Sequence, residues 1–141
     1  VQLGLSTDIV INQLLAGGTE FRATLTWFRD RTIDFGAGLL FDNAFADLNL
    51  QIWNSTFTTL YSESVSLYNE TEHLAFTLPS TDYYGIRVAY PSNRFDLVGL
   101  STEQFAVAWW GETASTIPEP GILTLLLIGA AALWSHRRRS R

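Results

Sequence analysis

The clearest structural signal in the chain is the segment Glu20-Phe21-Arg22-Ala23-Thr24-Leu25-Thr26-Trp27. Apolar side chains recur in it at every second position, and the side chains between them are charged or hydroxylated. A side-chain period of two lets a β-strand bury one face and leave the other in water. The pattern therefore predicts a half-buried strand over residues 20–28.

Similar patterns occur on both sides of this strand. We expect further strands at residues 8–15, 47–53, 57–65, 72–78, 83–90 and 104–110. Residues 29–45 and 91–94 are interpreted as loops, with Leu39-Leu40-Phe41 either a short strand or a segment packed over the core. About seven or eight short strands rich in aromatic and β-branched residues favour an all-β, antiparallel two-sheet sandwich. A closed barrel is the alternative, because the sequence does not show which edges pair.

The C-terminal segment has a different composition. Residues 121–134 are an uncharged, strongly apolar run of 14 residues, shorter than the ~20 residues that normally span a bilayer. Pro118 and Pro120 prevent a helix from extending backward. The run is followed by a set of terminal arginines, Arg137, Arg138, Arg139 and Arg141, which would serve as a signal for orientation in the membrane. We expect the apolar run to form a C-terminal transmembrane helix. Because arginine clusters stay on the cytoplasmic side of a membrane, the body is expected on the outside.

This order of features resembles a known sorting signal. Pro118, Glu119 and Pro120, then an apolar helix, then arginines at the extreme C-terminus resemble the PEP-CTERM signal of exported bacterial proteins, over residues 117–141. The resemblance implies that an exosortase-type enzyme recognises the triplet and removes the helix and the basic end. The mature protein would then have no membrane span. A simple tail anchor is the alternative.

These observations predict five regions along the chain. They are a β-sandwich domain over residues 1–111, a linker over 112–116, a processing motif over 117–120, a membrane helix over 121–134 and a basic end over 135–141.

Charge is distributed unequally between body and tail. Residues 1–116 carry 13 acidic residues and five arginines, a net of −8, whereas residues 117–141 carry a net of +3. An acidic body argues against nucleic-acid binding, whose affinity comes largely from cations on phosphates. The chain has no cysteine, so disulfides and thiolate chemistry are excluded.

The body shows a second resemblance, to an exported β-sandwich. The segments that carry it are Ala23–Trp27, Ala46–Ile52, Asn69–Leu74, Tyr83–Val88 and Phe105–Trp109. They resemble the C-terminal jelly-roll domain of subtilisin-like proteases, which also occurs in stand-alone PEP-CTERM proteins. Asn49 replaces the second aspartate of that family's Asp-Leu-Asp-Leu strand, and Thr71 replaces a valine. The resemblance implies a jelly-roll-like fold.

Residues able to carry catalysis are few. A nucleophilic triad needs a base near pH 7, usually histidine, and the chain contains only His73 and His136. No Gly-x-Ser-x-Gly pattern occurs. Acid pairs for glycoside hydrolysis could come from Glu63, Glu70, Glu72 and Asp82, although an acidic domain gives close pairs by chance. We therefore expect a protein without catalytic residues.

One group of oxygen-bearing side chains suggests a cation. Asp42, Asn43, Asp47 and Asn49 cluster at an expected loop-to-strand junction, and Ca²⁺ prefers carboxylate and carbonyl oxygens. Asp42, Asp47 and Asn49 are the calcium candidates. The alternative is that Asp42 and Asn43 form a turn and Asp47 caps a strand end. No other cofactor is expected.

The sequence favours a non-catalytic exported protein of the bacterial surface or extracellular matrix, where the PEP-CTERM resemblance implies association with exopolysaccharide. Two alternatives remain: the C-terminal accessory domain of a secreted subtilisin-like protease whose catalytic domain precedes Val1, and a carbohydrate-binding module. Aromatic side chains could stack on sugars or pack across strands. They are Trp53, Tyr61, Tyr68, Tyr83 and Trp110.

Overall fold

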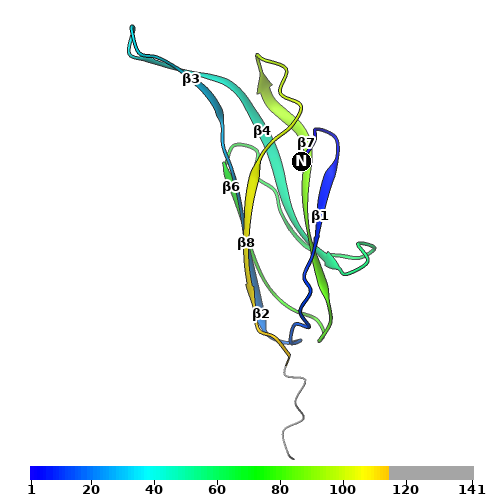
Figure 1. The fold of residues 1–141 in the computed structure, drawn as a ribbon. Coiled ribbons are helices and arrows are strands. Elements are labelled where there is room, and N and C mark those ends of the chain that lie inside the picture. Colours follow the sequence, from blue (N-terminus) through cyan, green and yellow to red (C-terminus); the bar gives the residue numbers. More distant parts are fainter. Residues whose placement is uncertain (115–141) are drawn as a thin grey trace, which may run out of the picture.

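The computed structural model describes residues 1–114, which form eight β-strands and contain no helix (Figure 1). In chain order the strands are β1 (Ser6–Val10), β2 (Glu20–Trp27), β3 (Asp30–Asp34), β4 (Leu39–Asn54), β5 (Leu60–Ser64), β6 (Thr71–Thr77), β7 (Tyr84–Asp96) and β8 (Phe105–Gly111).

The strands make two sheets in which every neighbouring pair is antiparallel. The larger sheet has the order β1-β7-β4-β3, and β5 also pairs with β4. The smaller sheet has the order β6-β2-β8. The expected all-β class, with two antiparallel sheets and about eight strands, is confirmed.

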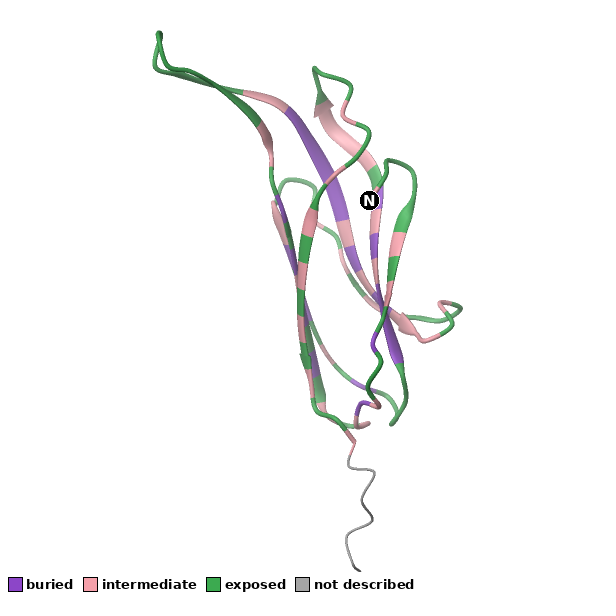
Figure 2. Ribbon diagram, viewed as in Figure 1, coloured by how far each residue is buried: buried purple, intermediate pink, exposed green. Residues whose placement is uncertain are grey.

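The core lies between the apolar faces of the two sheets, as Figure 2 shows by the buried residues along facing strands. The expected alternation of β2 is confirmed, because its odd-numbered residues are buried. The even-numbered residues of β7 from Tyr84 to Tyr90 are fully buried. From β4 the core receives Leu48, Leu50 and Ile52.

A buried tryptophan in the core joins the two sheets by a hydrogen bond. The indole Nε1–H of Trp27, at the end of β2, donates to the backbone carbonyl of Ala46 in β4, at 2.9 Å. Trp27 is 1% exposed and Ala46 is fully buried. A polar group in an apolar core needs such a partner, so this bond fixes one position of the smaller sheet over the larger.

The expected loop over residues 29–45 is wrong. It is a β-hairpin in which Ile33 pairs with Leu40, and it projects beyond the rest of the body (Figure 1). The turn lies at residues 35–38, where Gly38 has a φ of +65°. Leu39-Leu40-Phe41 belongs to β4 and stays about half exposed, so it does not pack over the core.

The expected loop over residues 91–94 is also wrong, because β7 continues through it to Asp96. The register with β4 shifts here: Asn49 pairs with Ala89, but Asp47 pairs with Ser92. Two residues of β7 therefore lie opposite Leu48, and one of them is Pro91. Proline is tolerated at such a bulge because it has no N–H to give to the ladder.

The first strand is shorter than residues 8–15, because β1 ends at Val10. The backbone of Ile11 still donates to Tyr84 O at 3.0 Å, and Leu15 then bridges to Asp82 and Thr113. Ile11 and Leu15 are both buried, so this part of the apolar run contributes to the core from irregular backbone.

Replacing Trp27 with phenylalanine tests the join between the sheets. Trp27→Phe removes the donor to a buried carbonyl, so we expect a loss of about 1–3 kcal/mol in the free energy of unfolding by urea. The matched control is Trp110→Phe, because Trp110 is 57% exposed. Its change should stay within about 0.5 kcal/mol. Equal losses in the two variants would contradict the structural role of the Trp27 bond.

Candidate functional site

The outer face of the larger sheet carries a row of polar side chains that crosses four strands. The register pairs Asp8 of β1 with Arg87 of β7, Arg87 with Gln51 of β4, and Gln51 with Glu63 of β5. Arg87 donates from Nε and Nη2 to the two carboxylate oxygens of Asp8, at 2.6 and 2.8 Å. Gln51 Nε2 donates to Glu63 Oε2 at 3.2 Å. The four side chains thus form a row of two hydrogen-bonded pairs, Asp8 with Arg87 and Gln51 with Glu63.

Aromatic rings hold the centre of this row in place. The guanidinium carbon of Arg87 lies 4.7 Å from the ring centroid of Trp53 and 5.1 Å from that of Phe57. Trp53 Nε1 also donates to Gln51 Oε1 at 3.1 Å, so Trp53 contacts both pairs of the row. The bidentate contact with Asp8 raises the pKa of Arg87 above its ordinary value, so its positive charge is fixed.

Phe57 reaches this position because Gly85 leaves room for it. A Cβ on Gly85 would lie 2.4 Å from the Phe57 ring, closer than any real contact. Phe57 itself has a φ of +55°, in the turn between β4 and β5. A non-glycine residue with this backbone conformation is strained, and the strain is offset here by packing of its ring.

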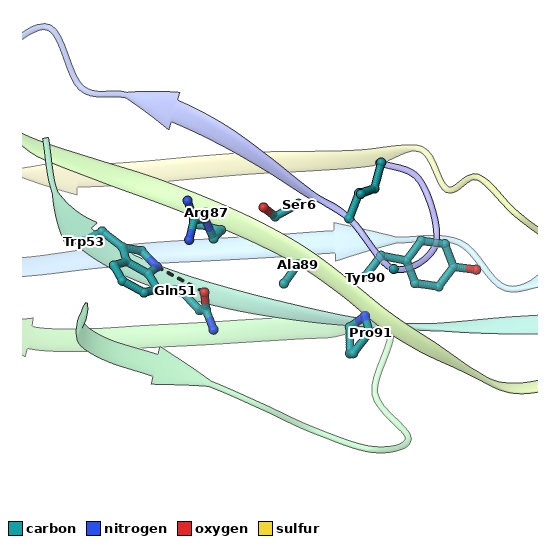
Figure 3. Close-up of a pocket in the computed structure, with 9 residues that line it drawn as sticks. Ser6, Gln51, Trp53, Arg87, Ala89, Tyr90 and Pro91 are labelled. Carbon is teal, nitrogen blue, oxygen red and sulfur yellow. Dashed lines mark hydrogen bonds between the residues drawn. The ribbon is translucent and has the colours of Figure 1, made fainter. Parts of the chain in front are cut away.

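Beside the row is an open groove of about 520 Å³ (Figure 3). It is lined by Gly4, Leu5, Ser6, Gln51, Trp53, Arg87, Ala89, Tyr90 and Pro91. Small residues from β1 and β7 form part of it, while Trp53, Gln51 and Arg87 lie together at one end. An aromatic ring beside fixed donors and acceptors suits a planar or polyhydroxylated ligand. We therefore treat the groove as the candidate site.

The base of the β3–β4 hairpin holds a separate charged cluster. Asp42 lies 3.1 Å from Arg29 Nη1 and 2.7 Å from Arg31 Nε. Glu70 lies 3.0 Å from Arg29 and 3.5 Å from Arg31. Hydrogen bonds from Arg31 and Arg29 lower the pKa of Asp42 below its ordinary value. Asp42, one of the calcium candidates, is thus paired with the guanidinium groups of two arginines.

The other calcium candidates lie further along β4. Asp47 is 3% exposed, and one of its carboxylate oxygens accepts a hydrogen bond from Arg94 Nη2. Its Oδ1 and the Oδ1 of Asn49 are buried without a hydrogen-bond partner. Within residues 1–114 no three acidic or histidine side chains gather in a way that could hold a metal. Calcium binding by Asp42, Asp47 and Asn49 stays a prediction.

The other residues weighed for catalysis point in different directions. His73 is exposed on the outer face of the smaller sheet, where its Nδ1 lies 3.0 Å from Thr24 Oγ1. Glu72 is 2% exposed and accepts a hydrogen bond from Ser64 Oγ at 2.5 Å. Glu63 belongs to the polar row, and Glu70 belongs to the arginine cluster.

Sequence reasoning missed most of the groove. Among its residues, only Trp53 is a ligand-binding candidate from the sequence. Alternation does place Gln51 and Arg87 on outward faces, but only the strand order brings them together with Asp8. The sorting residues Pro118, Glu119 and Pro120, the expected helix at 121–134 and the arginines Arg137, Arg138, Arg139 and Arg141 lie outside the described residues.

Comparison with protein-family models gives no match, and comparison with curated proteins gives none either. Within residues 1–114 no helix has the length and apolar character to cross a membrane.

Replacing Gly85 with alanine tests the packing beneath the row. Gly85→Ala should push the Phe57 ring away and lower the free energy of unfolding by about 1–3 kcal/mol, because the added methyl group has no space. The control is the same substitution in a Phe57→Ala background, where its cost should fall below about 0.5 kcal/mol. A cost that does not depend on the background, measured by urea unfolding, would show that the contact is unimportant.

Proposed function

We propose that this chain is a non-catalytic exported bacterial protein of the cell surface or extracellular matrix, directed there by a PEP-CTERM-type C-terminal signal. The observation that carries the proposal is the order of the Pro118-Glu119-Pro120 triplet, the apolar run 121–134 and the terminal arginines. This resemblance also supports a membrane helix before processing, and the separate resemblance of the body segments supports a jelly-roll-like arrangement of the body.

The way the body ends is compatible with removal of the tail. Ala16 N donates to Glu112 O, and Ala114 N donates to Leu14 O, both at 2.8 Å. The last described residues are therefore tied to the body just before the triplet. Cleavage there would leave all eight strands intact, so the processed protein would keep its fold.

Processing can be tested at the triplet. We expect the double variant Pro118→Ala, Pro120→Ala to accumulate as full-length protein in the membrane, because the enzyme would lose its recognition motif. The measurement is a cell fractionation with antibody against the body. The matched control is Pro79→Ala, which changes an exposed proline of the body. A double variant that is cleaved and released like the parent protein would refute the sorting assignment.

The groove favours a second candidate function, which is binding of a saccharide. Trp53 offers an aromatic ring, and Gln51 and Arg87 place hydrogen-bonding groups beside it. Stacking on an aromatic ring combined with fixed polar contacts is how a shallow surface can hold a sugar. Because most groups of the row already bond to one another, they would meet a ligand without reordering, which lowers the entropic cost of binding.

Two tryptophans on opposite outer faces allow a matched test of this function. Glycans that bind the parent protein on an array should bind Trp53→Ala at least about tenfold more weakly, because stacking is lost. Trp110→Ala, which changes the outer face of the smaller sheet, should bind like the parent protein. The opposite pattern would move the site to the smaller sheet, and absence of binding by the folded parent protein would reject this candidate.

A further inference from the structure

The projecting end of the β3–β4 hairpin, residues 33–41, has an unusual surface. We call these residues the hairpin tip. Its large apolar side chains are at least half exposed: Ile33 53%, Phe35 89%, Leu39 51%, Leu40 58% and Phe41 50%. A contiguous apolar surface of this kind marks a site that contacts another molecule or a membrane.

The apolar side chains occupy both faces of the ribbon. Ile33 pairs with Leu40 and shares one face with it, whereas Leu39 and Phe41 lie on the other face. Phe35 continues from the end of β3 into the turn. A protein groove or a flat protein surface would cover one face of a ribbon and leave the other in water. A lipid phase surrounds an inserted ribbon and covers both faces.

The charges of the hairpin are placed in a way that suits shallow insertion. Between residues 35 and 41 there is no charged side chain. The carboxylate of Asp34 turns back onto the turn, where Oδ1 accepts hydrogen bonds from Gly36 N at 2.9 Å and Ala37 N at 3.1 Å. These bonds give partners to one carboxylate oxygen and to two backbone donors that would otherwise be costly to remove from water.

The length of the apolar part matches the depth of an interfacial contact. Interfacial segments enter the boundary between headgroups and acyl chains by about 5–10 Å. Two or three residues of each strand, at ~3.3 Å per residue, cover this depth. The ion pair between Arg31 and Asp42 then lies at headgroup level. On the body side of this ion pair, the open backbone edges of the ribbon stay in water, where they can be hydrated.

We propose that the hairpin tip inserts shallowly into a lipid bilayer and gives the body a membrane contact of its own. This inference goes beyond the proposed function and does not depend on the sorting signal, because it rests on residues of the body alone. Pairing of two copies along the free edge of β3 is less favourable, since it would leave both apolar faces in water. The net charge of −8 on residues 1–116 makes uncharged lipid surfaces preferable to anionic ones.

A site-specific probe can test the insertion in the full chain, which contains no cysteine. Phe35→Cys is labelled with an environment-sensitive fluorophore and mixed with phosphatidylcholine vesicles whose acyl chains carry bromine. We expect a blue-shifted emission that the brominated chains quench. The matched control is the same label at Tyr68→Cys, because Tyr68 is 74% exposed but lies in the loop between β5 and β6. That label should show neither change, even where another part of the chain holds the protein on the vesicle.

A second variant separates insertion from general attachment. Leu40→Asp, placed in the protein labelled at position 35, should weaken the quenching by about tenfold. It adds a second carboxylate to the tip, without the hydrogen bonds to the turn that Asp34 makes, and such a charge opposes insertion. Its thermal unfolding should match that of the parent protein, since Leu40 is 58% exposed. Equal quenching at both label positions, or none at position 35, would overturn the proposal. An emission shift that needs no lipid and grows with protein concentration would also overturn it and would identify a second copy as the occupant.

Discussion

Neither sheet of this protein has a place for its apolar face except against the other sheet. The smaller sheet contributes a face built on Phe21, Leu25 and Trp27, and the larger sheet contributes the fully buried faces of β4 and β7. Burial of such faces is the main favourable term in folding, but it is not directional. The bond from Trp27 to Ala46 O adds direction, because a buried donor must meet its acceptor. Because the two apolar faces cover each other, the opposite face of each sheet is exposed to solvent. The polar row and the groove lie on such an exposed face.

Alternating hydrophobicity predicted the strands that have one buried and one solvent-exposed face. It failed at the β3–β4 hairpin for a physical reason: both faces of that ribbon are exposed, so Leu39, Leu40 and Phe41 follow one another without a polar partner between them. It also failed at Pro91, where proline suggested a loop, because the register shift that accommodates it depends on the neighbouring strand. Local sequence cannot show a bulge that a partner strand creates.

The candidate site was predictable only in part, for a similar reason. Outward positions such as Gln51 and Trp53 can be found from the period of two. The pairing of Arg87 with Asp8 joins residues 79 positions apart, and it requires knowledge that β1 lies beside β7. Asp42 and Asp47 were expected at a loop-to-strand junction, but both lie within β4. Arg31 of β3 and Arg94 of β7 pair with them, and the sequence alone could not place these strands beside them.

The arginines of the body give it a further physical property. All five of them form ion pairs with carboxylates of the same chain, so their charges are balanced within the molecule. They are at positions 22, 29, 31, 87 and 94. The acids in excess must be balanced by small cations drawn from the surroundings. In a layer of many copies, these counterions would raise the osmotic pressure, so the layer would take up water at low salt and lose it at high salt.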